Sequence, residues 1–147
     1  MTSSGRDSAR GRDGAHLRKP PIVLSLADRE RLQVIALNAL LDNPRVAGPL
    51  LEEIDRAEVL PDEIQAPDRV RLGSWVEYCD AGRRETRKVR IVETARRNSE
   101  LELCVLSPLG VALIGMAAGQ SIIASDHRGS EWLLQVVGVT RPGEVAP

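Results

Sequence analysis

Aromatic side chains are almost missing from this chain of 147 residues, which has two tryptophans, one tyrosine and no phenylalanine. Aromatic rings usually supply much of the apolar area of a core and the surfaces on which nucleic-acid bases stack. The core must therefore consist of leucine, valine and isoleucine, and sequence-specific binding of RNA is not expected. The apolar fraction of 42% and the charged fraction of 28% are those of an ordinary globular protein.

Cysteine, histidine and net charge are also scarce. The two cysteines, Cys79 and Cys104, are too few for a disulfide framework and are interpreted as buried thiols of a reducing cytoplasm. The two histidines, His16 and His127, lie at no ligand spacing from a cysteine or carboxylate, so no metal site is predicted. A net charge of -1 gives no general attraction to nucleic acid or to acidic substrates.

No apolar run has the length of a signal peptide or of a membrane helix. The first run, residues 22–24, is far shorter than a signal-peptide core. Residues 103–125 contain no charge, but proline, glycine and serine interrupt them, so we interpret them as a buried strand, turn and strand rather than a membrane span. We therefore expect a cytoplasmic protein with no membrane partner.

Motifs of the common enzyme classes are missing as well. The glycines at 110, 115 and 119 are not followed by Lys-Ser or Lys-Thr, so they form no phosphate-binding loop. No Ser-His-Asp or Cys-His arrangement stands out. The chain is therefore not predicted to be an enzyme, and we expect no catalytic residue, no cofactor and no small-molecule substrate.

Residues 1–19 are predicted to be a disordered tail, and residues 20–64 a helical hairpin that we call the arm. Ser25 is a good N-cap for the first helix, with Asp28 at its third position. The apolar positions of this helix are Leu32, Ile35, Ala36 and Ala39, with Val34, Leu37 and Leu41 widening the same stripe. Gly48 and Pro49 are predicted to start the second helix, with Pro49 at its first helical position. Leu50, Ile54 and Ala57 form the facing stripe.

Residues 65–141 are predicted to form an α+β domain of five antiparallel strands and one short helix, followed by a tail over 142–147. The alternation of Val70, Leu72, Val76 and Tyr78 predicts the first strand, with a bend at Gly73. Similar patterns predict strands around residues 88–92, 101–106, 121–125 and 132–137.

The most specific pattern lies in residues 101–125: a strand, a Ser-Pro corner, a short helix within 111–115, a glycine turn and another strand. Proline cannot donate to a sheet ladder, so the corner ends the strand. The pattern resembles the signature of the bacterial Gre transcript-cleavage factors at Ser107, Pro108, Ala112, Leu113, Ile114, Gly115 and Gly119. The form made by Pro108, Gly110, Ala112, Leu113 and Gly115 looks closer to the Rnk family, short-armed relatives of the Gre factors called regulators of nucleoside diphosphate kinase.

This resemblance covers residues 20–141 and implies an FKBP-like version of the β domain behind a short coiled-coil arm. It implies a regulator that binds RNA polymerase near the secondary channel and meets nucleic acid only through the transcription complex. In Gre factors the Ser-Pro corner contacts the rim of that channel. The resemblance therefore makes Ser107, Pro108, Leu109 and Gly110 candidate polymerase contacts. We expect the protein to be a monomer.

The arm tip differs from the Gre pattern. Gre factors carry acidic residues there that hold a catalytic magnesium ion in the polymerase active site. Here Asp42 is the one acidic residue of the tip, Asn43 follows it, and Arg45 has the opposite charge. Asp42 and Asn43 before a proline are also ordinary helix-ending residues. We therefore expect regulation of elongation without transcript cleavage.

A basic patch flanks the second predicted strand and comprises Arg83, Arg84, Arg87, Lys88 and Arg90. It could bind phosphate or an acidic protein groove, or it could be a solvated strand face.

Two alternative functions stay open on the sequence. An FKBP-like domain suggests a prolyl isomerase, but such an enzyme needs an aromatic-lined pocket that three aromatic residues supply poorly. A regulatory partnership with nucleoside diphosphate kinase, without polymerase, is the other alternative.

Overall fold

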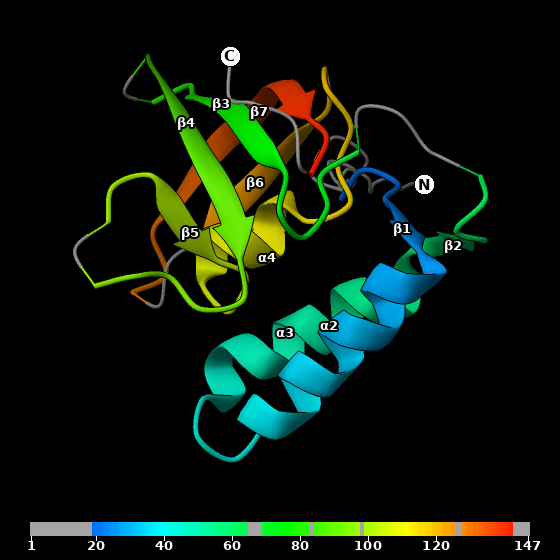
Figure 1. The fold of residues 1–147 in the computed structure, drawn as a ribbon. Helices are drawn as coiled ribbons and strands as arrows, with labels where there is room; N and C mark the ends of the chain where they lie inside the picture. Colours follow the sequence, from blue (N-terminus) through cyan, green and yellow to red (C-terminus); the bar gives the residue numbers. More distant parts are fainter. Residues whose placement is uncertain (1–18, 65–68, 83, 98, 126–127, 143–147) are drawn as a thin grey trace, which may run out of the picture.

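The computed structural model describes residues 19–64, 69–82, 84–97, 99–125 and 128–142 (Figure 1). Two helices precede a five-stranded sheet, so the predicted α+β class is confirmed at that level. Nearly all of the predicted N-terminal tail and most of the C-terminal tail lie outside the described residues. None of the described helices is long and apolar enough to cross a membrane.

The first arm helix, α2 (Leu26–Ala39), begins where the sequence predicts. Ser25 is its N-cap, and the Ser25 hydroxyl accepts a hydrogen bond from the Asp28 N–H at 3.1 Å. That bond satisfies one of the amide groups that have no partner within the first helical turn.

The second arm helix, α3 (Pro44–Arg56), begins earlier than predicted. Pro44, not Pro49, takes the first helical position, where a missing N–H costs nothing. Pro49 lies inside the helix and cannot donate the usual hydrogen bond to the carbonyl of Arg45. The helices lie side by side in Figure 1, joined by the short turn at the arm tip.

Only part of the predicted stripe on α2 faces α3. Leu32 and Ala36 are buried with Leu50 and Ile54 of α3 in one cluster. By contrast, the side chains that were expected to widen the stripe are exposed: Val34, Leu37 and Leu41. Val34 and Leu37 lie roughly 140–200° around the helix from Leu32, because each residue turns an α-helix by about 100°, and Leu41 lies in the turn after the helix. The prediction that they face inward is wrong.

The sheet has the order β5-β4-β3-β7-β6. Its strands are β3 (Trp75–Asp80), β4 (Glu85–Val92), β5 (Glu102–Cys104), β6 (Ser121–Ser125) and β7 (Glu131–Thr140). The β4–β5 pair is parallel, so the prediction of five antiparallel strands is wrong at this edge. A parallel pair requires the chain to run back along the sheet between β4 and β5, which a tight hairpin would not do.

The strand expected from Val70 is shorter than predicted. Gly73 has a φ of +90° and turns the chain, so β3 begins only at Trp75. The two cysteines lie in β3 and β5 as expected, but both are half-buried rather than buried.

A small parallel sheet that the sequence did not predict lies at the base of the arm. It pairs β1 (Val23–Ser25) with β2 (Glu58–Leu60). The Val23 N–H donates to the Gly115 carbonyl at 3.1 Å, and the Leu72 N–H donates to Asp28 at 3.3 Å. The buried cluster continues from the arm into the sheet without a break. The arm and the β domain, which the sequence divides between residues 64 and 65, therefore share one hydrophobic core.

Candidate partner-binding site around the Ser-Pro corner

The Ser-Pro corner starts helix α4 (Pro108–Leu113), three residues before the helix expected from the sequence. The Ser107 hydroxyl donates to the Cys104 carbonyl at 2.6 Å and accepts from the Gly110 N–H at 3.0 Å. Pro108 occupies the first turn, where its fixed φ suits a helix. Serine and proline together act as a helix start, and the two hydrogen bonds hold the corner rigidly on β5.

The four candidate contacts at this corner are not equivalent. Ser107, Pro108 and Leu109 are half-buried, whereas Gly110 is buried. A Cβ atom on Gly110 would lie 2.3 Å from the Cys104 carbonyl oxygen, so this position lets α4 approach β5 closely. Gly110 therefore supports the corner, and Pro108 and Leu109 present its apolar surface.

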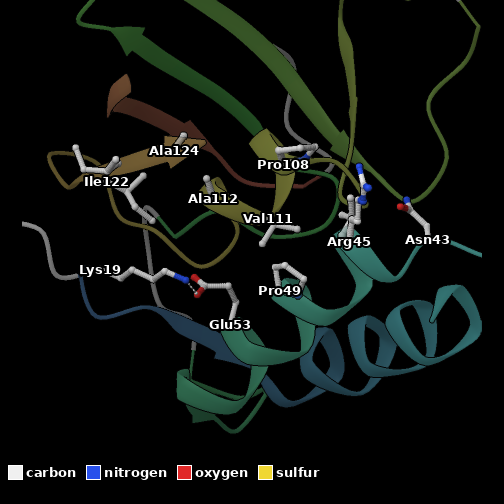
Figure 2. A pocket seen from close by; sticks show the side chains of 12 residues that line it. Lys19, Asn43, Arg45, Pro49, Glu53, Pro108, Val111, Ala112, Ile122 and Ala124 are labelled. Atoms are coloured by element: carbon white, nitrogen blue, oxygen red, sulfur yellow. Dashed lines mark hydrogen bonds and ion pairs between the residues drawn. The ribbon is translucent and has the colours of Figure 1, made fainter. Parts of the chain in front are cut away.

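Pro108 lines a groove of about 520 Å³ that we call the α3–α4 groove (Figure 2). Its walls come from α3, α4 and β6. The residues that line it include Pro49 and Glu53 of α3, Val111 and Ala112 of α4, and Ile122, Ile123 and Ala124 of β6, with Lys19, Asn43 and Arg45 at its ends. The groove joins segments about a hundred residues apart, so no local sequence signal predicts it.

Leu109 lines a second hollow of about 460 Å³ on the same face of the sheet as α4. Tyr78 and Trp132, two of the three aromatic residues of the chain, also line this hollow. The alternation of residues 132, 134 and 136 places Trp132 on the buried face, and Tyr78 pairs with Val136. The alternation in the sequence predicts the face of Trp132, but the register that brings Tyr78 close to it is known only from the folded chain. The Tyr78 side chain itself is only 6% exposed.

The predicted basic patch is divided between the two faces of the sheet. Arg84, Arg87, Lys88 and Arg90 are all exposed, and Arg83 lies outside the described residues. Because side chains alternate along β4, Arg87 shares the face of buried Val89 and lines the second hollow. Lys88 and Arg90 point to the opposite face. The patch therefore does not form one continuous cationic surface.

The arm tip presents an apolar side chain beside its one carboxylate. Leu41 is 95% exposed and Asp42 is also exposed. Asn43 precedes α3 but makes no side-chain capping bond, and it lines the end of the α3–α4 groove with Arg45. Asp42 therefore lies at the exposed tip, whereas the next residue, Asn43, lines the groove.

Glu53 carries a buried charge in the wall of this groove. Its side chain is 2% exposed and forms ion pairs with Lys19 at 2.9 Å and with Arg56 at 2.8 Å. Burial alone would raise the pKa of Glu53, but hydrogen bonds from Arg56 and Lys19 outweigh it and hold this pKa below its ordinary value. Glu53 is therefore ionised at neutral pH and serves as a structural ion pair, not as a proton donor. Among the described residues, histidine, cysteine, aspartate and glutamate gather in no cluster suited to a metal ion.

Both parts of the chain match known protein families. Residues 65–141 match the family "Transcription elongation factor, GreA/GreB, C-term", and residues 20–60 match the family "Rnk N-terminus". The chain is 30% identical over 105 residues to the "Regulator of nucleoside diphosphate kinase" of Escherichia coli strain K12. The matched region spans 71% of this chain and 77% of that protein, and the Shigella flexneri protein of the same name matches equally well.

A solved structure shows the same arrangement over most of the chain. It is the "Prokaryotic transcription elongation factor GreA/GreB from Nitrosomonas europaea", with 30% identity and a TM-score of 0.65. The similarity covers 84% of this chain and all of that one. The chain therefore belongs to the GreA/GreB transcription elongation factor family and, within it, to the Rnk type of regulator.

Proposed function

We propose that this protein binds bacterial RNA polymerase beside the secondary channel and modulates transcription elongation without cleaving the transcript. The observation that carries the proposal is the capped corner at Pro108 and Leu109, a rigid, partly exposed apolar surface between two hollows. A surface that is already rigid loses little conformational entropy on docking, which favours affinity. The family membership supports a regulator of this kind.

The arm supports the second half of the proposal. Helix α2 has 14 residues, so it extends about 21 Å at the usual rise per residue. Its tip offers one carboxylate, the lower limit of the one or two that protein-held magnesium usually takes together with substrate oxygens. A short arm with an apolar, singly charged tip can occupy a channel entrance but is poorly equipped to hold the catalytic metal.

The docking proposal predicts a specific defect for Pro108→Asp. The change removes an apolar contact and adds a carboxylate that must lose water at an interface. We expect the affinity for polymerase core to fall by about 2 kcal/mol, roughly thirtyfold in Kd. The melting temperature of the isolated protein should change little, because Pro108 is half-exposed and aspartate is tolerated in a first helical turn.

Val137→Asp is the matched control for this measurement. Val137 is 49% exposed in β7, and it lies on the opposite face of the sheet from α4. The control should bind polymerase core as the unchanged protein does. If Pro108→Asp binds polymerase core as tightly as Val137→Asp and the unchanged protein do, the contact lies elsewhere than at the corner. If Pro108→Asp melts at a clearly lower temperature, the corner serves packing alone.

The absence of cleavage is tested with stalled, backtracked transcription complexes. We expect no shortening of RNA 3′ ends when the protein is added, and reduced cleavage when it is added together with a Gre factor, because the two compete for the channel entrance. The Asp42→Ala variant should behave as the unchanged protein does. Shortened transcripts that disappear with Asp42→Ala would overturn the proposal.

Two other functions need separate tests. The printed name of the enterobacterial relatives links them to nucleoside diphosphate kinase. Co-purification of the kinase, but not of polymerase core, would favour that partner. If the protein were a prolyl isomerase, the second hollow would be the place for the substrate proline, but Tyr78 exposes too little of its ring there to contact it. We expect no rate enhancement in a peptide isomerisation assay.

A further inference from the structure

Strand β6 has a free edge along the α3–α4 groove. It is the last strand of the sheet and pairs only with β7. The Val136 N–H bonds the Gln120 carbonyl, so the backbone groups of Ile122 and Ala124, two and four residues on, also face β7. In an antiparallel ladder the intervening residues face away. The N–H and C=O of Ile123 therefore point outward, and no described residue outside the sheet hydrogen-bonds to them.

The shape of the groove shows that this edge is accessible. Three consecutive β6 residues line it, although successive side chains of a strand point to opposite faces. A hollow touching all three must run along the strand edge. Helix α3 stands across from this edge, and Val111 and Ala112 form an apolar wall between them (Figure 2).

The edge lacks three of the usual features that prevent strand pairing. Natural edge strands commonly carry a charge, a proline or a bulge that blocks an added strand. The sequence of β6 is Ser-Ile-Ile-Ala-Ser, and its ladder with β7 has an unbroken register. A short, uncharged edge beside an apolar groove is the arrangement that accepts an extended peptide in β-strand addition.

Charge at the groove ends indicates what this peptide carries. Arg45 is exposed at one end and has no ion pair with any described residue. Lys19 stands at the other end with half of its side chain exposed. Glu53, the acidic residue between them, is already neutralised by Lys19 and Arg56. The charge that the groove ends offer to a bound peptide is therefore positive.

We propose that the α3–α4 groove binds an extended, apolar segment of a partner protein with acidic residues at its ends, by strand addition to β6. The peptide backbone would pair with the outward N–H and C=O of Ile123. Alternate side chains would rest on Val111 and Ala112, and a carboxylate would pair with Arg45. A second copy of this chain is a poorer occupant, because its own sheet would have to enter beside α3. This proposal does not depend on the partner being polymerase.

The direct test uses the peptide acetyl-Asp-Val-Thr-Val-Thr-Asp-amide, labelled with fluorescein, and the full chain. Its acidic ends allow either strand direction. We expect saturable binding at concentrations below roughly 1 mM, together with a shift and slowed hydrogen exchange of the Ile123 amide. The same peptide with alternate backbone nitrogens methylated, or with lysine in place of both aspartates, should bind at least about tenfold more weakly. No binding, or equal binding of the methylated peptide, would overturn the proposal.

Two variants locate the binding on the protein. Ile123→Pro removes the outward N–H without breaking a bond to β7, and proline is tolerated on such an edge. It should weaken peptide binding at least about tenfold, whereas Ile123→Ala, which keeps the N–H, should stay within about twofold. Arg45→Glu should weaken binding similarly, and Arg90→Glu, on the open face of the sheet, should not. Melting of each variant checks its folding, and unchanged affinity in a folded Ile123→Pro would refute strand addition.

Residues 1–18 precede Lys19 and are the competing occupant. If they fill the groove, a chain lacking them should bind the peptide at least about tenfold more tightly, and that result would assign the groove to this chain's own tail. Unchanged affinity supports a segment supplied by a partner.

Discussion

Gly110→Ala should destabilise the protein by about 3 kcal/mol, although alanine is the better helix former. A Cβ at this position would lie 2.3 Å from the Cys104 carbonyl oxygen and 2.9 Å from the Val105 Cα. Both are backbone atoms that cannot move away as a flexible side chain can. Helix α4 must therefore shift away from β5, which strains the hydrogen bonds of Ser107 and opens the packing around Val105. Overpacking of this kind costs about 1–3 kcal/mol or more.

Gly48→Ala is the matched control, because Gly48 also lies in a helix and a Cβ there would meet nothing within 4 Å. Alanine should stabilise α3 by up to about 1 kcal/mol through helix propensity alone. Thermal melting should therefore shift in opposite directions, down by roughly 10 °C for Gly110→Ala and up by a few degrees for Gly48→Ala. A Gly110 variant that melts as the unchanged protein does would contradict the close approach of α4 to β5.

The close packing of Gly110 changes how the signature around the corner is interpreted. The resemblance to Gre factors makes Gly110 a candidate polymerase contact together with Pro108 and Leu109. The structure buries Gly110 beneath the corner and leaves the other two partly exposed. A glycine in a signature motif is thus explained by packing, and the proposed docking role belongs to the side chains that the glycine supports.

Local signals in the sequence predicted the elements that depend on local chemistry. Ser25 and Asp28 marked the start of α2, and the alternation around Leu134 and Val136 marked β7, because capping and period-two burial act within a few residues. The Ser-Pro corner was also predicted, although its proline proved to start a helix as well as to end a strand. These features need no knowledge of the rest of the chain.

Features that depend on distant partners were missed. The three residues of β1 pair with β2 more than thirty positions away, and neither strand is long enough to show an alternating pattern. The direction of β5 depends on the path of residues 93–101, which carries no turn signal for a parallel pair. The exposed position of Val34 and Leu37 follows from where α3 packs, since α2 has apolar residues on opposite sides. The candidate site was predicted at Pro108 and Leu109, but the two hollows beside it require the folded chain.

Ile54→Asp should cause the largest loss of stability among these changes, at least about 4 kcal/mol. Ile54 is 2% exposed and belongs to the same buried apolar cluster as Leu32, Leu50 and Ile22, so a carboxylate there would lack both water and a partner. Aspartate would gain a proton or force α3 away from α2, and each response costs the apolar contacts of the isoleucine. Leu37→Asp is the matched control on the same arm. Its side chain is 57% exposed, so the free energy of unfolding should change by less than about 1 kcal/mol.

The same variant tests whether the arm and the sheet unfold together. Both tryptophans, Trp75 and Trp132, lie in strands of the sheet, so tryptophan fluorescence reports the sheet and far-ultraviolet circular dichroism reports mainly the arm helices. Ile54 and Leu24 of the arm belong to the same buried cluster as Val76 of the sheet, so arm and sheet share one apolar core. We therefore expect Ile54→Asp to lower the urea midpoint of both signals by the same amount. A variant that loses its helix signal while the fluorescence transition stays unchanged would show that the arm is an independent unit, and that the shared core contributes little to the stability of the sheet.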